Sequence, residues 1–363
     1  MKKHLLTSLI SVSLLGMPAI ASAKEVKVVS SLAPVHSLVE QVLNGTGENT
    51  LLIPTTQSPH GFQLRPSHMR QLKSADLVFW IGPGLEAFID VPLLEGNSKS
   101  VELIEAPDIE LLELREGGVW AAHDHGHDHD AHKDHEDHEK HDDHDHNEAH
   151  KDHDNHDHSE HAHKEDGHHD HDHDKHDHDS HKHEDEHDHH HDGNDPHIWL
   201  DADNAMAMLK EITKRLIAEY PEHAATFQKN ADAALEKLEA NHSARHDKLH
   251  DLDDRPFIVF HDAYQYFEAS HHMKGVGSIL LRPNDGASAK RLAEIRELIA
   301  QQGAVCVFRE PQFPEKLVKT VIKGSDVKSG VLDPLGQGLE PGPALYDQLL
   351  DNLTDNLINC LQE

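Results

Sequence analysis

Three histidines of this 363-residue chain stand where a protein can hold a metal ion. His60 follows TLLIPTTQSP, His197 lies in NDPHIWLD and His261 follows PFIVF, so each is placed at the start of a loop after an extended segment. Imidazole nitrogens bind zinc at about 2.0–2.1 Å in a tetrahedral array, and loops at the strand ends of two facing lobes can supply them. Because the three are far apart in sequence, their spacing alone leaves a structural role for each histidine open.

Two carboxylates hold similar positions. Asp262 is next to His261, and Asp333 lies in GVLDPLG. Three histidines with an open coordination position also describe a catalytic zinc, which needs a general base or acid near the metal-bound water. Asp262 could be that group, or it could orient a ligand histidine without touching the metal. The chain has no H-E-x-x-H motif, which argues against a zinc hydrolase of that type.

Other histidines outside the central region have weaker claims. His36 and His68 fall in predicted helices, where packing or surface roles are expected. Three more are spaced by four residues along a predicted helix, where neighbours could chelate a metal but a solvated face is the interpretation we favour. These three are His242, His246 and His250. His271 and His272 receive no role.

Residues 121–192 contain 28 of the 40 histidines, with 6 lysines against 27 acidic residues. Without apolar periodicity the segment cannot bury a core, so we expect a disordered insertion when no metal is bound. It can offer many overlapping zinc sites, each weaker than a preformed site because binding must order the chain. It could gather zinc, buffer an excess or signal occupancy; the alternative is a solubilising spacer. The auxiliary metal ligands that we single out are His181, His183, His187, His189, His190 and His191.

The N-terminus predicts secretion. Lys2 and Lys3 precede a short apolar core, and Ala21-Ser22-Ala23 provides a cleavage site for a signal peptide. No cysteine lies near that site, so no lipid anchor is expected, and a periplasmic location fits best. The formal charge of −34 argues against nucleic acid as a partner, because no basic patch is evident.

The two cysteines, Cys306 and Cys360, are an even count in a secreted chain, which favours a disulfide over two buried free thiols. In the chain-entropy model, closing a loop of this length stabilises the fold by about 4 kcal/mol.

Strands alternate with helices on both sides of the insertion, which predicts parallel sheets wrapped by helices. Between the halves, residues 221–252 predict one long helix with a single apolar stripe, about 48 Å in length. The fold class that we expect is α/β: two parallel-sheet lobes joined by a long rigid linking helix, with ligands at the carboxyl ends of the strands in the cleft between lobes. The expected strands are VKVVSSL, TLLIP, DLVFWIG, SVELIE, PFIVF, GVGSILL, AVCVFRE and VKSGVL.

Five motifs together resemble the periplasmic zinc-binding proteins of ABC importers, within the wider group of metal-specific solute-binding proteins. They occur in the family's order and cover the mature chain, including the His-rich insertion; they are SPHGFQLRPS, DPHIWLD, VFHDAYQYFE, FREPQF and VLDPLG. The resemblance implies two lobes, a rigid linking helix, Zn²⁺ in the cleft and a membrane permease with its ATPase as partners. It also implies pairing of the two cysteines.

The resemblance matches His60, His197 and His261 to the family's histidine ligands. Three imidazoles favour zinc, whereas similar manganese carriers have a carboxylate where His261 stands. An aspartate that matches Asp333 is a further ligand in those carriers; here Asp333 or water could be the fourth ligand. Some members have a glutamate before the first histidine, a position occupied here by Pro59, so that ligand is missing.

The predicted organisation is therefore a signal peptide at 1–23, an N-terminal lobe at 24–202 that carries the insertion at 121–192, a linking-helix region at 203–254 and a C-terminal lobe at 255–363. The predicted function is capture of Zn²⁺ by a monomeric periplasmic protein and its delivery to an ABC permease. The alternatives are a zinc-buffering or adhesive surface protein without a transporter, and a zinc hydrolase.

Overall fold

The computed structural model describes residues 24–89, 99–115, 120, 193–280, 283 and 286–362. All of them lie in one of the two compact units into which the chain divides. The predicted signal peptide, the insertion at 121–192 and the six auxiliary histidines at 181–191 lie outside the described residues.

The N-terminal lobe is built on a four-stranded, fully parallel sheet in the order β2-β1-β3-β4. The strand β3 is LVFW and is buried at all four positions, as expected for a central parallel strand between two helical layers. The strands are β1 (Lys27–Ser30), β2 (Glu48–Leu51), β3 (Leu77–Trp80) and β4 (Lys99–Glu102). The helices of this lobe are α1 (Ala33–Leu43), α2 (Pro66–Ser74) and α3 (Pro83–Glu86), with 3-10 turns at η1 (Pro59–Gly61) and η3 (Leu103–Glu105).

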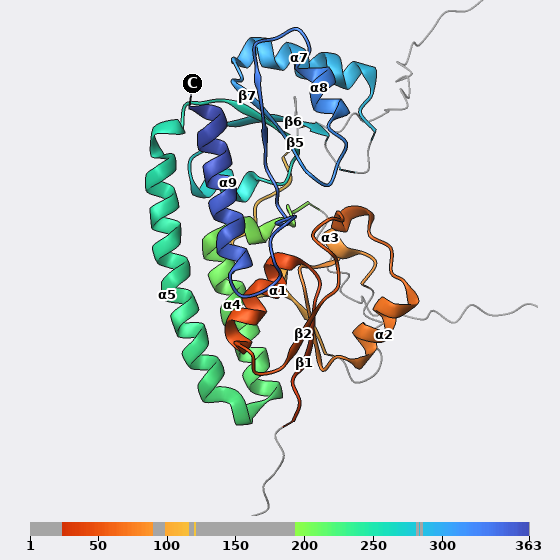
Figure 1. Cartoon of the computed structure of the whole chain (residues 1–363), viewed down its shortest axis with the longest axis vertical. Coiled ribbons are helices and arrows are strands. Elements are labelled where there is room, and N and C mark those ends of the chain that lie inside the picture. The colour runs from red at the N-terminus through yellow and green to blue at the C-terminus, as the bar shows by residue number, and fades with distance from the viewer. Residues whose placement is uncertain are drawn as a thin grey trace, which may run out of the picture. The chain divides into compact units, whose positions relative to one another are not determined.

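The C-terminal lobe repeats this topology in a second parallel sheet with the order β6-β5-β7-β8. The two α/β lobes predicted from the sequence are thus confirmed (Figure 1). The strands are β5 (Phe257–His261), β6 (Gly275–Leu280), β7 (Cys306–Arg309) and β8 (Lys328–Val331). The helices are α6 (Gln265–Ser270), α7 (Ala289–Gln302) and α8 (Lys316–Val321).

The long helix α5 (Ala224–Leu249) runs beside both lobes (Figure 1). Its 26 residues correspond to about 39 Å. The predicted helix at 221–252 ends in 3-10 turns on both sides, η6 (Pro221–His223) and η7 (His250–Leu252). A second helix of the linking region, α4 (Ala202–Glu219), packs along α5 and begins with the Asp201 carboxylate capping the Asn204 amide at 2.7 Å.

The C-terminal helix α9 (Leu345–Leu361) ties the lobes together. It packs on α1, on α5 and on β8. The Tyr346 amide donates to the Ser37 hydroxyl at 3.0 Å, so the helix begins against the N-terminal lobe. At its other end Cys360 forms the predicted disulfide with Cys306 of β7. One apolar core runs through the N-terminal sheet, α4, α5 and α9 into the C-terminal lobe, so the lobes are joined by close packing as well as by the chain.

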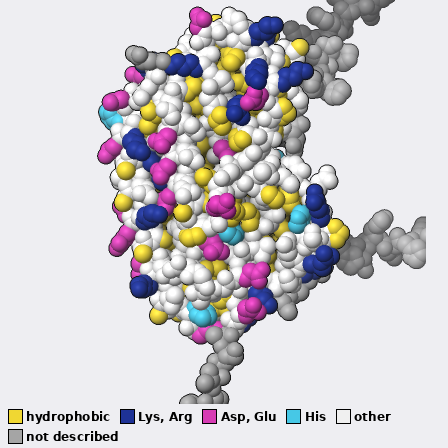
Figure 2. All heavy atoms as spheres, viewed as in Figure 1, with side chains coloured by type: hydrophobic (Ala, Val, Ile, Leu, Met, Phe, Trp, Pro, Cys, Tyr) yellow, Lys and Arg dark blue, Asp and Glu magenta, His cyan; other side chains and the backbone are white. Residues whose placement is uncertain are grey.

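In the part of the chain that the structure describes, no helix has the length and apolar character needed to cross a membrane. On the face drawn in Figure 2, acidic and basic side chains are interspersed and do not form a single-sign patch.

Candidate metal centre

The three predicted histidines come from three different elements that end at one place. His60 is the middle residue of η1, the turn that follows β2, and Pro59 starts that turn with its fixed φ. His197 immediately precedes the turn η5 (Ile198–Leu200), and His261 is the last residue of β5. Parallel strands present their following loops at one edge of the sheet, which is where α/β folds place ligands. The two lobes therefore bring these imidazoles together.

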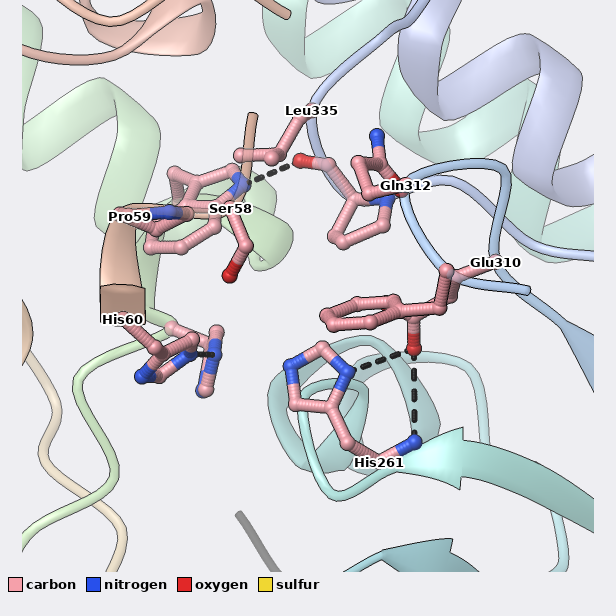
Figure 3. A pocket seen from close by; sticks show the side chains of 11 residues that line it. Ser58, Pro59, His60, His261, Glu310, Gln312 and Leu335 are labelled. Carbon is pink, nitrogen blue, oxygen red and sulfur yellow. Dashed lines mark hydrogen bonds and ion pairs between the residues drawn. The ribbon is translucent and has the colours of Figure 1, made fainter. Parts of the chain in front are cut away.

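The geometry of the three rings is compact. Nε2 of His60 lies 3.2 Å from Nε2 of His197, and the three ring centroids are 5.3–5.5 Å apart. Each ring offers one nitrogen within 4.8 Å of the other two. The cavity that they line has a volume of about 10 Å³, room for one water-sized particle or ion (Figure 3). His197 and His261 are buried, and His60 is half-buried.

Two buried carboxylates orient the rings. Asp195 Oδ1 lies 2.6 Å from Nδ1 of His197 and also accepts the backbone N–H of that residue at 3.0 Å. Glu310 Oε1 lies 2.6 Å from Nδ1 of His261, as the dashed line in Figure 3 shows. A carboxylate on Nδ1 holds the proton there and leaves Nε2 with its lone pair, which is the usual arrangement behind metal-bound histidine.

His261 supplies an observation that points to an ion. Its Nε2 is buried and has no hydrogen-bond partner among the described residues. Leaving a buried polar atom unpaired is unfavourable by about 1–3 kcal/mol. Because Nδ1 faces Glu310, a cation that binds at Nε2 would satisfy both nitrogens of the ring. The donor set of three imidazoles fits a borderline ion such as zinc.

The surroundings of His60 and His197 favour the neutral form of these two rings. Burial lowers the pKa of His60 well below its usual value, and the neighbouring His197 and His261 lower it further. Burial also lowers the pKa of His197 well below the usual value, with His261 acting in the same direction. Neutral imidazoles have their lone pairs available, so protons compete with a metal less strongly here than at an exposed histidine. Burial raises the pKa of Asp195 to about 7, against the opposing hydrogen bond from the His197 backbone.

Asp333 lies near the centre but is engaged elsewhere. Its Oδ1 accepts the Gln312 amide at 2.7 Å and the Leu335 backbone N–H at 3.0 Å. Its Oδ2 accepts the backbone N–H of Gln337. These bonds cap the turn that follows β8, and Asp333 faces a separate cavity of about 200 Å³. Its use as a fourth ligand stays a prediction, and it would have to give up hydrogen bonds to fill that role.

Asp262 faces Arg115, not a ligand ring. Nε of Arg115 lies 3.1 Å from both carboxylate oxygens of Asp262, and Nη1 lies 2.6 Å from Glu268. Arg115 belongs to the N-terminal part of the chain and the two acids to the C-terminal lobe, so this cluster joins the lobes beside the centre. The negative charge of Asp262 acts on His197 from a distance. It raises the pKa of that ring and so opposes the lowering by burial.

The two orienting carboxylates are residues that sequence reasoning did not select. Asp195 stands two residues before His197 in the motif DPH, and Glu310 follows β7 at the same strand-end position that marks His261 on β5. Applying the strand-end criterion to glutamates would have selected Glu310. No comparable signal reveals which side chain an acid will face.

The described histidines outside the centre differ in how far they are buried and in what they contact. His36 is buried and its Nε2 lies 3.0 Å from the Asn49 carbonyl, a packing role as expected. His68 accepts the Arg65 backbone N–H on Nδ1 at 3.1 Å. His250, the first residue of the turn η7 that follows α5, is exposed, in keeping with a solvated face. His242 and His246 are half-buried against the end of α6, so the expected solvated face is wrong for them.

Comparison with known proteins agrees with this geometry. Residues 28–360 match the family of the periplasmic zinc-uptake complex component A, ZnuA. The high-affinity zinc uptake system protein ZnuA of Brucella suis is 42% identical over 93% of this chain and 92% of its own length. The protein of the same name from Paracoccus denitrificans is 37% identical over 98% of both chains. In fold, the periplasmic zinc-binding protein TroA of Treponema pallidum covers 93% of the chain, and the chain covers 99% of it, with a TM-score of 0.66 at 17% identity. The chain therefore belongs to the ZnuA family of periplasmic zinc-uptake components.

Proposed function

We propose that this protein captures Zn²⁺ with His60, His197 and His261 and delivers it to an ABC permease that works with its ATPase. The observation that carries the proposal is the convergence of three imidazoles whose facing nitrogens lie within 4.8 Å of one another around a cavity the size of one ion. Family membership supports zinc as the cargo and transport as the purpose.

The fourth coordination position belongs to water or to Asp333. The three hydrogen bonds that Asp333 accepts in the turn favour water. Carboxylate ligands would shift the preference toward harder ions such as manganese, whereas an N₃ set with water suits zinc. Cu²⁺ is the ion most able to compete in vitro, since nitrogen ligands bind it more tightly than Zn²⁺.

The rest of the chain serves this cargo. We infer cleavage after Ala23, release into the periplasm as a monomer, and a lobe organisation at 24–202, 203–254 and 255–363. The insertion at 121–192 would collect or sense zinc through residues such as His181, His183, His187, His189, His190 and His191.

Hydrolysis is a weaker reading of the same centre. A catalytic zinc needs a free base or acid beside the bound water. Asp195 and Glu310 both contact the Nδ1 side of a ring, and Asp262 is paired with Arg115. Each of these three acids is therefore already paired with a histidine or an arginine and is not free to act as a general base or acid.

Zinc-limited growth and uptake test the proposal. In cells that lack this protein, the wild-type chain should restore uptake of labelled zinc, and His197→Ala should not. His250→Ala, in the exposed turn η7 that follows α5, is the matched control and should behave as wild type. Retention of zinc-loaded protein on its purified permease should accompany uptake. Zinc binding without retention or uptake would favour the buffering or adhesive alternative and overturn the transport function.

A further inference from the structure

A second group of histidines lies at the junction of the linking helix and the C-terminal lobe. His242 and His246 are one turn apart on α5, and His271 and His272 follow the last residue of α6. The ring of His271 lies 5.2 Å from that of His242 and 6.0 Å from that of His246, centroid to centroid. His246 also lies 5.6 Å from His272. We call these four residues the junction histidines.

The spacing of the junction histidines resembles that of the metal centre. Centroids in the metal centre are 5.3–5.5 Å apart, and those of the three junction contacts are 5.2–6.0 Å apart. Two histidines four residues apart on a helix share one face and can bind one ion, and a third ring from another element completes a site with three protein ligands. The difference is in ring orientation, because the junction nitrogens do not yet converge within 4.8 Å as those of the centre do.

Two buried ring nitrogens of the junction histidines lack a hydrogen-bond partner among the described residues. They are Nδ1 of His242 and Nδ1 of His271. No carboxylate accepts from either atom, in contrast to the Nδ1 atoms of His197 and His261. A ring that turns by about 180° about χ2 exchanges its nitrogens with its carbons while keeping its place, since this torsion is two-fold and soft. Such rotations can aim the unpaired nitrogens at a common ion.

Burial and the surrounding charges act on His271. Burial, the largest cause, and the neighbouring His242, His246, Arg245 and His272 together lower the pKa of His271 to about 3. The Arg245 cation is itself neutralised, because Nε lies 2.8 Å from Asp351 and Nη2 lies 3.3 Å from Asp347.

The carboxylate of Asp201 also interacts with this group. The charge of His242 lowers the pKa of Asp201, against the larger upward effect of burial, so this carboxylate lies close enough to interact with the group.

We propose that His242, His246 and His271 form a second binding site for a divalent cation of the zinc class, with His272 at its solvent side. Such an ion would connect α5 to the segment between α6 and β6, and so join the linking helix to the C-terminal lobe. The site does not depend on the function of the three-histidine centre, because it shares no ligand with it.

Site-resolved histidine labelling tests the proposal on the full mature chain. Diethylpyrocarbonate modifies unprotonated, accessible imidazoles, and peptide mass spectrometry reports each position separately. Free zinc is held at graded concentrations with a chelator buffer, so the insertion cannot deplete it. His246 should lose reactivity at least about tenfold as free zinc rises, since a bound nitrogen cannot react. His250, in the turn η7 just after α5, should keep its reactivity and serves as the control.

Two variants make the result decisive. In His271→Gln, zinc should no longer protect His246, while His60 in the metal centre stays protected. His242→Gln should give the same result, so a folding defect in one variant does not end the test. Reactivity of His246 that stays the same at every zinc concentration, with His60 protected, would overturn the second site and leave the first intact. Protection of His246 that persists in both variants would also overturn it.

Discussion

The carboxylate of Glu310 lies 2.6 Å from Nδ1 of His261, and it fixes which nitrogen of that ring faces the cavity. Glu310 follows β7 and His261 ends β5, neighbouring strands of one sheet, so the pairing follows from the sheet order. Asp195 contacts Nδ1 of His197 in the same way, but here the two residues are only two positions apart in the sequence. Two of the three rings are therefore each oriented by a carboxylate on Nδ1.

Replacing the orienting carboxylate should weaken zinc binding without removing a ligand. For Glu310→Gln we expect zinc affinity to fall by about 10–100-fold, the usual effect of losing a carboxylate behind a metal-bound histidine. Competition against a chelator of known affinity measures it. Glu315→Gln is the control, because that glutamate is partly exposed and pairs with Lys319. Equal affinities for both variants would refute the orienting role.

The pairing of Arg115 with Asp262 and Glu268 should contribute strongly to stability. Glu268 is buried, so Arg115→Ala leaves its charge without a partner. Removing one member of a buried ion pair destabilises by about 3 kcal/mol or more. Urea unfolding measures the loss. Arg215→Ala is the control, since Arg215 is half exposed and pairs with Glu211 of the same helix; a loss no larger than in this control would contradict the prediction.

The disulfide should stabilise the C-terminal lobe against unfolding. Cys306 and Cys360 are 54 residues apart, and the chain-entropy model gives about 4 kcal/mol for a loop of that length. Replacing both by alanine should lower the free energy of unfolding by about that amount, whereas adding a reductant to the double variant should change nothing further. Unchanged stability on loss of the bond would show that the unfolded chain is already restricted in this region.

The buried ring of His271 should make stability fall in acid. Burial lowers its pKa in the folded protein to about 3, while the unfolded chain protonates it near the usual value of 6.5. Between these two values the unfolded state binds one more proton, so the contribution is present above about pH 6.5 and is lost as the pH falls. Relative to His271→Gln, the wild type should lose up to about 1.4 kcal/mol per pH unit in that window.

Urea unfolding in the presence of a metal chelator, between about pH 7.5 and about pH 5, measures this difference. The comparison with the variant cancels Glu86 and Asp195, whose pKa values burial raises to about 7 and which act in the opposite direction. His250→Gln should show the pH dependence of the wild type. Parallel curves for the wild type and His271→Gln would contradict the prediction.

The repeated strand–helix order predicted both lobes because each apolar run and each helical period is a local property. The run LYDQLLDNLTDNLINCL has the apolar spacing of a helix, and it forms α9 over its whole length. The second strand was expected at TLLIP but spans Glu48–Leu51, since pairing with β1 sets its register and apolarity does not. The helix α4 was contained in the linking region without being distinguished from α5.

The candidate site also divides into residues that local sequence identifies and contacts that depend on the tertiary fold. His60, His197 and His261 could be selected from strand-end context and family resemblance, and the fold brings them together. The partners of Asp262 and Asp333 could not be predicted, because they depend on side-chain direction. For His242 and His246 the spacing left chelation open but favoured a solvated face, because only the tertiary fold places His271 against them.

The most direct test of the metal centre is a zinc titration of the mature chain without residues 121–192, in competition with a chelator of known affinity, with and without His197→Ala. The account predicts a tight site in the shortened chain that the substitution abolishes, while His250→Ala keeps it. Absence of tight binding in the shortened chain would contradict the account, because zinc would then be held by the insertion and not by the three-histidine centre.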